Sequence, residues 1–151
     1  MTTNGVEIRQ ATAADVNLLV PLFDAYRQIY RQPSDLERAR GFLLERLEHN
    51  QSVILLAFQD AAAIGFTQLY PSFSSGAMAS IFILNDLFVT PEGRRQGVGS
   101  ALLQAAAEYA RHSGAIRLVL STEVTITTAQ SVYDRMGWKR DTVFCVYQLA
   151  L

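Results

Sequence analysis

The stretch from Leu84 to Ala110 constrains the fold more than any other part of the chain. An apolar segment is followed by Pro91 and Gly93, residues that set a turn. Gly97 and Gly99 then open a segment whose apolar positions recur at helical spacing, at Val98, Leu102, Ala106 and Tyr109. The stretch therefore predicts a strand, a glycine-containing loop and a helix, in that order.

A loop of this kind is suited to holding a phosphate group. The first turn of a helix has backbone N–H groups without partners and carries about half a positive charge. Glycines at that point let a pyrophosphate approach the backbone closely. Arg94 and Arg95 add positive charge beside the loop. The residues therefore favour a phosphate-bearing ligand, although an ordinary glycine-rich turn would also contain them.

Two common phosphate-binding motifs are excluded because each lacks a required residue. A nucleoside-triphosphatase loop needs a Lys directly after its second glycine, and no Lys follows Gly97 or Gly99. A dinucleotide-binding loop needs a third glycine, where this chain has Leu102. It also needs an acidic residue about 20 positions later, where the apolar run 118–120 stands. The pattern Arg94-x-x-Gly97-x-Gly99 remains to be explained.

This pattern, preceded by Leu-Phe-Val and followed by a helix rich in Ala and Leu, closely resembles the acetyl-CoA motif of the GNAT superfamily of N-acetyltransferases. A second segment, Thr127 to Trp138, resembles the GNAT segment Asn-x-x-Ala-x-x-Leu-Tyr-x-x-x-Gly-Phe/Trp. It matches at Ala129, Val132, Tyr133, Gly137 and Trp138. Ile126 stands where the family has Asn, whose side chain contacts CoA. The run 68–75 resembles a GNAT branch with histone- and polyamine-acetylating members.

The resemblance implies an α/β fold in which a mixed, mostly antiparallel central sheet carries helices on both faces. The hydrophobic patterns agree with this order of elements. They predict strands at 7–11, 52–58, 63–70, 79–89, 116–120 and 142–149, and a loop at 71–76. They predict helices after Asp15, over 36–49, after Gly97 and around Tyr133. With 151 residues and no linker or repeat, the chain is predicted to be one domain, 1–151.

The resemblance also implies that acetyl-CoA is the co-substrate. Loop N–H groups would hold its pyrophosphate, and the end of the preceding strand would hydrogen-bond the pantetheine arm as an added strand does. The N–H of Val89 or of a neighbour would stabilise the tetrahedral oxyanion. The predicted cofactor-binding residues are Leu87, Phe88, Val89, Arg94, Arg95, Gln96, Gly97, Val98, Gly99 and Ser100.

The mechanism that the resemblance implies is direct attack of a neutral amine on the acetyl thioester in a ternary complex. The phenol of Tyr133 is the predicted acid that protonates the departing thiolate, and the alternative is that it packs as a helical aromatic residue. Asp86 and Glu123 are the candidates for a general base, and either could instead be a structural cap.

No cluster of His, Cys or acidic residues has metal-ligand spacing, so no metal is predicted.

The acceptor side of the cleft is implied to lie at the first two helices and their connection. The predicted substrate-binding residues are Tyr26, Tyr30, Asp35 and Tyr70, although a solvated loop and an amphipathic helix would also explain them. Aromatic faces and carboxylates attract an ammonium group. We therefore predict a small primary amine, such as a polyamine or an amino-acid derivative, as the acceptor. Alternatives are a protein or peptide lysine, an N-terminus, and a chain that binds acyl-CoA without turnover or acts only as an interaction protein.

Composition sets the remaining expectations. A net charge of −1 gives no basic field for nucleic acid. The single Cys cannot form an internal disulfide, and the polar start lacks the regions of a signal peptide. No apolar run approaches the ~20 residues of a membrane span. We therefore expect a cytoplasmic protein without a nucleic-acid or membrane partner, and a homodimer is left open.

Overall fold

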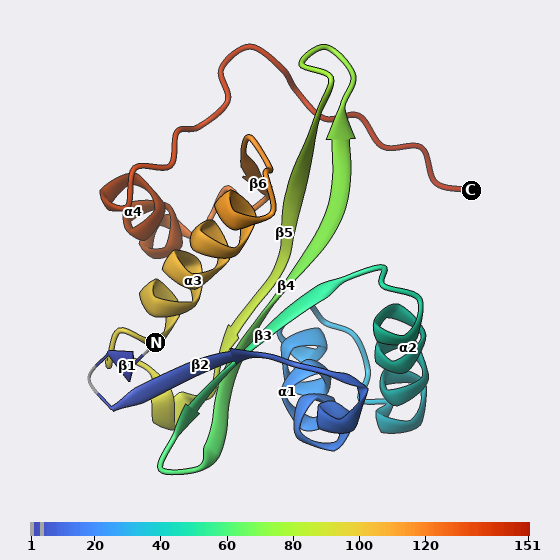
Figure 1. Ribbon diagram of the computed structural model, residues 1–151, viewed down its shortest axis with the longest axis vertical. Coiled ribbons are helices and arrows are strands. Elements are labelled where there is room, and N and C mark those ends of the chain that lie inside the picture. The colour runs from blue at the N-terminus through green and yellow to red at the C-terminus, as the bar shows by residue number, and fades with distance from the viewer. Residues whose placement is uncertain (1, 4) are drawn as a thin grey trace. The chain divides into compact units, whose positions relative to one another are not determined.

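In the computed structural model, which describes residues 2–3 and 5–151, six strands form one sheet in chain order (Figure 1). The strands are β1 (Thr2–Thr3), β2 (Val6–Gln10), β3 (Val53–Gln59), β4 (Ala62–Ser74), β5 (Ala79–Val89) and β6 (Leu118–Leu120). Neighbours from β1 to β5 are antiparallel, whereas β6 runs parallel to β5. The sheet is mixed and mostly antiparallel, as the sequence predicts.

The chain divides into two compact units, Met1–Ser121 and Thr122–Leu151. The first contains the sheet, the short helices η1 (Ala13–Asp15) and η2 (Pro91–Gly93), and the helices α1 (Val16–Ile29), α2 (Leu36–Glu48) and α3 (Val98–His112). The second contains α4 (Thr127–Arg135). The single domain over 1–151 stays a prediction. Among the described residues, none of the helices combines the length and the apolar character that crossing a membrane would require.

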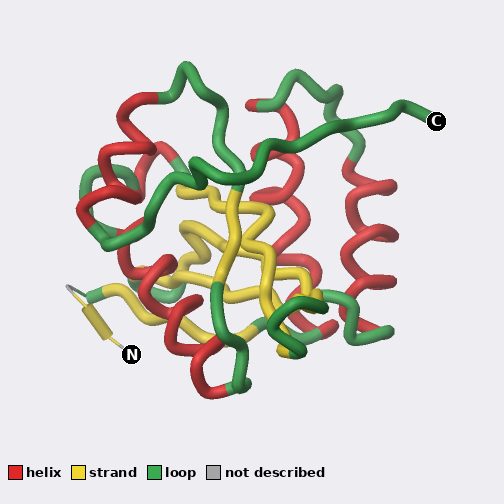
Figure 2. Tube along the Cα trace, turned by 90° about the horizontal axis from the view of Figure 1, so that it is seen from above, coloured by secondary structure: helices red, strands yellow, loops and turns green. Residues whose placement is uncertain are grey.

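Helices cover both faces of the sheet in the first unit, as the sequence predicts. Helices α1 and α2 lie on one face and α3 lies on the other (Figures 1 and 2). The core under α1 and α2 includes Leu19, Leu43, Ile54, Leu56 and Phe66, all of them fully buried. Helix α3 packs an apolar stripe against the opposite face of the sheet, since the buried residues of this helix recur at helical spacing.

The connection from β2 to α1 is held by Asp15. Its carboxylate accepts two hydrogen bonds from the guanidinium of Arg9, at 2.9 and 2.8 Å, and one from the backbone N–H of Thr12 at 2.8 Å. The Arg9 guanidinium lowers the pKa of Asp15 to about 2. This pair ties the end of β2 to the first turn of the helical segment.

We expect Asp15→Asn to lower the free energy of unfolding at neutral pH by about 1 kcal/mol, because the variant lacks the charge that pairs with Arg9. The folded-state pKa of Asp15 lies below its unfolded value of about 4, so the carboxylate stabilises the fold above that pH. This contribution is lost as the pH falls through about 2. Denaturant unfolding of both proteins from pH 7 to pH 2 checks the prediction. A difference that stays constant with pH would contradict it.

The pairing of β4 with β5 contains a β-bulge at Asn85. Gln68 pairs with Asp86 and Leu69 pairs with Leu84, so Asn85 has no partner on β4. An inserted residue of this kind bends a strand and redirects the side chains beside it. Asn85 itself is exposed, whereas Asp86 and Gln68 are buried.

The predicted loop at 71–76 is wrong at its start, because Pro71–Ser74 continues β4 and pairs with β5. Strand β3 accompanies β4 only as far as Leu69. Beyond that residue β4 is an edge strand, and an edge can accommodate Pro71, which has no N–H to donate. The long β4–β5 hairpin therefore extends past the residues that look like a loop.

The predicted strand at 142–149 is also wrong, because residues 138–151 form neither helix nor strand. The apolar residues of this segment are exposed, namely Val143, Phe144, Val146, Tyr147 and Leu149. β-Branched and aromatic residues favour a strand only where a neighbouring strand pairs with them and covers one face. Within the described part of the chain, the sheet ends at β6 and no strand pairs with this segment.

Candidate active site

A cavity of about 340 Å³ lies in the first unit, where α1 and α2 meet β4 and β5. Its lining includes four aromatic residues, Phe23, Tyr26, Phe42 and Tyr70, and three charged residues, Arg27, Arg38 and Asp86. Gln32, Ala39 and Asn85 complete the lining. The volume is at the small end of the range for small-molecule sites.

Asp86 is the acidic residue of the cavity lining, and it is almost completely buried. Its two carboxylate oxygens accept hydrogen bonds from the Gln68 amide at 2.6 Å and from the Asn85 amide at 2.7 Å. Burial raises the pKa of Asp86 above that of an ordinary carboxyl group, while the hydrogen bonds from Asn85 and Gln68 oppose the rise. Asp86 is therefore a carboxylate that accepts a proton more readily than an exposed one.

Two tyrosines stand beside this carboxylate. The hydroxyl of Tyr26 donates a hydrogen bond to the backbone carbonyl of Asn85 at 3.2 Å. Burial and the nearby Asp86 charge raise the pKa of Tyr26, and the same two causes raise the pKa of Tyr70 to about 12. Both phenols therefore remain protonated at neutral pH. They can donate hydrogen bonds in the cavity but cannot serve there as bases.

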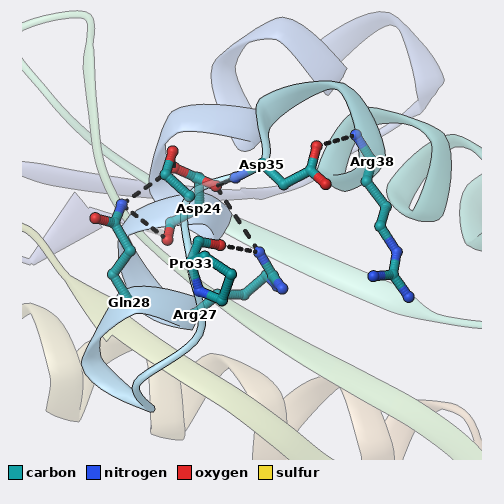
Figure 3. A network of polar contacts seen from close by, with 7 residues as sticks. Asp24, Arg27, Gln28, Pro33, Asp35 and Arg38 are labelled. Atoms are coloured by element: carbon teal, nitrogen blue, oxygen red, sulfur yellow. Dashed lines mark hydrogen bonds and ion pairs between the residues drawn. The ribbon is translucent and has the colours of Figure 1, made fainter.

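The corner between α1 and α2 is built around Asp24, which is buried (Figure 3). Its carboxylate accepts hydrogen bonds from the Ser34 hydroxyl at 2.6 Å, the Asp35 backbone N–H at 2.8 Å and the Gln28 amide at 3.1 Å. The guanidinium of Arg27 lies 4.0 Å from the same carboxylate and donates to the Pro33 carbonyl at 3.0 Å. These contacts lower the pKa of Asp24, so it stays charged.

Of the four predicted substrate-binding residues, Tyr26 and Tyr70 line the cavity together with Asp86, whereas Tyr30 and Asp35 do not. The ring of Tyr30 is exposed and lies 5.0 Å from the ring of Tyr26. Asp35 is the N-cap of α2, where its carboxylate accepts a hydrogen bond from the backbone N–H of Arg38 at 3.0 Å.

Arg27, Arg38 and Phe42 line the cavity although no motif in the sequence singles them out. Helical periodicity marks the two arginines as part of the polar faces of their helices, where most charged residues are simply solvated. The sequence signal that could have identified these residues is Pro33, which separates α1 from α2. The chain turns there, so that the end of α1 lies near the start of α2.

The predicted phosphate loop leads into α3 as expected. Gly97 is the N-cap of this helix and has a φ of 76°, and Arg95 has a φ of 63°. Within the described part of the chain, no backbone acceptor receives the N–H groups of residues 95–100, and the first bond of the helix runs from Ala101 to the Gly97 carbonyl at 3.0 Å. The loop is exposed, while Val98 anchors it in the core. Several unpaired N–H groups therefore lie together beside two arginines.

The end of β5 offers further backbone groups. In the described residues, β6 accompanies β5 only over 82–84. The N–H of Thr90 donates to the Ile64 carbonyl at 2.8 Å, which marks a hydrogen-bonded pair. Such pairs alternate with non-bonded ones along an antiparallel ladder, so the backbone groups of Leu87 and Val89 point away from β4. An amide-bearing chain could add to this edge as a strand does.

Three other predicted cofactor-binding residues make contacts within the protein. Phe88 is buried, and the alternation of the ladder turns its backbone groups toward β4. The Gln96 side chain accepts a hydrogen bond from Gln59 at 2.8 Å and donates to the Glu92 carbonyl at 2.9 Å. The Nε of Arg94 donates to the Val89 carbonyl at 3.2 Å. Because Arg94 binds the carbonyl of Val89, the N–H of Val89 is the remaining backbone group of this residue that points away from β4.

Tyr133 and Glu123 belong to the second unit. Tyr133 lies on α4, half-buried, with its ring 6.0 Å from that of Trp138. The backbone carbonyl of Glu123 accepts a hydrogen bond from the Gln130 amide at 3.3 Å. The roles of both residues in proton transfer stay predictions. In the described part of the chain, no group of three or more His, Cys, Asp or Glu side chains could hold a metal ion.

Comparison with known proteins shows what this chain is similar to. The model of the Acetyltransferase (GNAT) family matches residues 18–138. The uncharacterized N-acetyltransferase YhfO of Bacillus subtilis (strain 168) is 50% identical over 144 residues, which are 95% of this chain and 97% of that protein. The aminoalkylphosphonate N-acetyltransferase of Salmonella typhimurium (strain LT2) is 30% identical over 135 residues, which are 89% of this chain and 85% of that protein. The crystal structure of a probable acetyltransferase superposes with a TM-score of 0.91 and 44% identity, covering 96% of this chain and 97% of that one.

Proposed function

Because this chain belongs to the GNAT family of acetyltransferases, we propose that it transfers the acetyl group of acetyl-CoA to a small primary amine bound beside Asp86. The observation that carries this proposal is the cavity itself, in which a buried carboxylate stands among aromatic walls. Carboxylates and aromatic faces both attract an ammonium group, and the attraction grows as water is excluded. The cavity therefore suits the acceptor of an N-acetyltransferase.

The phosphate loop and the edge of β5 support acetyl-CoA as the donor. The unpaired N–H groups of residues 95–100, beside Arg94 and Arg95, suit the pyrophosphate of CoA. The outward backbone groups of Leu87 and Val89 suit the amides of the pantetheine arm. Leu87 and Val89, proposed for the donor, and Asp86, proposed for the acceptor, belong to one strand, β5, so the proposal brings the two substrates to neighbouring positions.

The proposed reaction forms a bond between the amine nitrogen and the acetyl carbon and breaks the bond between that carbon and the sulfur of CoA. An alkylamine with a pKa of ~10.4 is almost wholly protonated at neutral pH, and loss of this proton costs ~4.6 kcal/mol. Asp86 accepts that proton, directly or through water, because its raised pKa makes it a better base. The N–H of Val89 stabilises the oxyanion, and Tyr133 protonates the departing thiolate.

The acceptor proposed is a polyamine or an amino-acid derivative. The size of the cavity, about 340 Å³, suits a molecule of this kind. The Salmonella relative, whose name states that it acetylates aminoalkylphosphonates, supports a small amine as well. Acetylation of a peptide lysine or an N-terminus is the second candidate, because a lysine side chain presents the same ammonium group to Asp86.

The test combines calorimetry with acetyl-CoA and CoA and an assay of thiol release with a panel of amines. The panel contains spermidine, free amino acids and a lysine-containing peptide. We expect binding of acetyl-CoA and thiol release that depends on a small amine. Binding without thiol release across the panel would favour a non-catalytic acyl-CoA-binding module. The observation that motivates this alternative is Ile126, which stands where the family has Asn. A peptide preferred by orders of magnitude would overturn the choice of acceptor.

We expect Tyr133→Phe to lower kcat by about a hundredfold with little change in the affinity for CoA, since that is the usual effect of losing a general acid. Acetyl-CoA turnover and calorimetry with CoA measure the two quantities. Tyr109→Phe, on α3, is a control that removes a phenol elsewhere in the chain. Full activity of Tyr133→Phe would assign Tyr133 to packing alone.

A further inference from the structure

The cavity carries charges of both signs, supplied by different elements. Asp86 comes from β5, whereas Arg27 comes from the last turn of α1 and Arg38 from the first turn of α2. An ammonium group is attracted by the carboxylate and repelled by the guanidinium groups. The lining therefore distinguishes one part of the acceptor from another by charge.

The two arginines differ in how far their charge is already neutralised. Arg27 lies 4.0 Å from the buried carboxylate of Asp24 and donates to the Pro33 carbonyl. The side chain of Arg38 is exposed, and no ion pair or hydrogen bond joins its guanidinium to any of the described residues. Figure 3 shows this guanidinium pointing away from Asp35. The Asp35 carboxylate instead accepts a hydrogen bond from the backbone N–H of Arg38. The cavity thus contains a cation whose charge is not compensated within the protein.

From this arrangement we infer that the acceptor is a zwitterionic small molecule, an amine that carries a carboxylate, phosphonate or phosphate group at its other end. Its amine lies at Asp86 and its anion is held by Arg38, with Arg27 in support. This inference rests on the proposed function, since it names the class of amine for the same cavity. It favours the amino-acid derivative over the polyamine.

The physical reason is the charge that each acceptor places beside the arginines. A guanidinium group binds a carboxylate or a phosphate group through two parallel N–H donors, which fixes orientation as well as affinity. A diamine or polyamine of similar length brings a second ammonium group to the same place, where like charges repel. An amine whose other end is uncharged brings neither effect. The expected order of preference is therefore an amine with an anionic end, then an amine with an uncharged end, then a diamine.

The test compares four amines of similar length that differ at one end, namely β-alanine, 2-aminoethylphosphonate, ethanolamine and 1,3-diaminopropane. The wild-type protein is expected to use at least one of the two anionic amines with a kcat/KM at least tenfold above that of ethanolamine and further above that of 1,3-diaminopropane. The two anionic amines distinguish a carboxylate from a phosphonate acceptor. Equal use of all four amines, or a preference for the diamine, would overturn the inference while leaving the proposed function intact.

Variants assign the preference to Arg38. In Arg38→Gln the ratio of kcat/KM for the preferred anionic amine to that for 1,3-diaminopropane should fall at least tenfold, and the change should lie in KM because the anion is remote from the reacting nitrogen. Arg38→Glu should reverse the preference. Arg40→Gln removes an exposed arginine of the same helix that does not line the cavity, and its ratio should stay at the wild-type value.

The outcomes separate the two ideas. If no amine of any kind releases thiol, the proposed function fails and the inference fails with it. If amines are acetylated but Arg38→Gln and Arg40→Gln change the ratio equally, only the inference fails, because the effect then comes from the net charge of the surface. Circular dichroism of each variant, together with its affinity for CoA, verifies that the first unit remains folded.

Discussion

Gly99→Asp is expected to abolish detectable CoA binding, a fall in affinity of about a hundredfold or more, because like charges brought together in a binding site cost several kcal/mol. The substitution places a carboxylate in the first turn of α3, beside the unpaired N–H groups of residues 95–100. That carboxylate repels the pyrophosphate and also competes for the same donors. Calorimetry with CoA measures the loss.

The fold should survive this substitution. A Cβ at Gly99 meets only the Val89 side chain, at an ordinary 3.9 Å, and an acidic residue suits the N-terminus of a helix. Gly99→Ala is therefore the matched control, and its affinity for CoA should stay within a few fold of wild type. Gly76→Asp adds the same charge at a position with open space around it. A folded Gly99→Asp protein that binds CoA normally would contradict the loop assignment.

Asp86→Asn is expected to lower kcat/KM for the amine by about a thousandfold at pH 7, because it removes both a proton acceptor and a charge that attracts the ammonium group. The affinity for CoA should change little, since Asp86 lines the cavity that we propose for the acceptor. Gly99→Asp and Asp86→Asn should therefore separate donor binding from acceptor chemistry.

The pH dependence gives a second readout. A base must be ionised to act, so wild-type kcat/KM should fall as the pH drops through the raised pKa of Asp86. That decline should lie above the pH at which an ordinary carboxyl group titrates, about 4. In Asp86→Asn the decline due to this residue should disappear, and activity should rise with pH as more neutral amine forms. An unchanged pH profile would show that Asp86 is not the base.

Much of the fold could be predicted because its signals are local. The turn before α3 depends on Gly97, whose left-handed conformation suits glycine, and on a helix whose apolar stripe is visible in the sequence. The segment 142–149 shows the opposite case. Its strand propensity is genuine, but a strand also needs a partner, and local composition contains no information about partners.

The candidate site was predictable where a motif or the family resemblance points to its residues, and Tyr26, Tyr70 and Asp86 are predicted residues that line the cavity. The loop residues 94–100 follow from a pattern of glycines and arginines, whereas the β-bulge at Asn85 depends on how two strands align. The place of Arg38 depends on how α2 folds back against α1 after Pro33. Both are consequences of tertiary packing, and neither can be deduced from the periodicity of one segment.

The buried Asp24 network has a consequence for the thermodynamics of acceptor binding. Fixing the backbone of one flexible residue costs roughly 1 to 2 kcal/mol in conformational entropy, and an acceptor that had to order the corner between α1 and α2 would lose that much affinity for each residue. In this chain the bonds from Ser34, Asp35 and Gln28 to Asp24 order the corner during folding, before any ligand arrives. If Arg27 and Arg38 bind the acceptor as we propose, the acceptor meets a corner that is already hydrogen-bonded and has to immobilise little more than the side chain of Arg38.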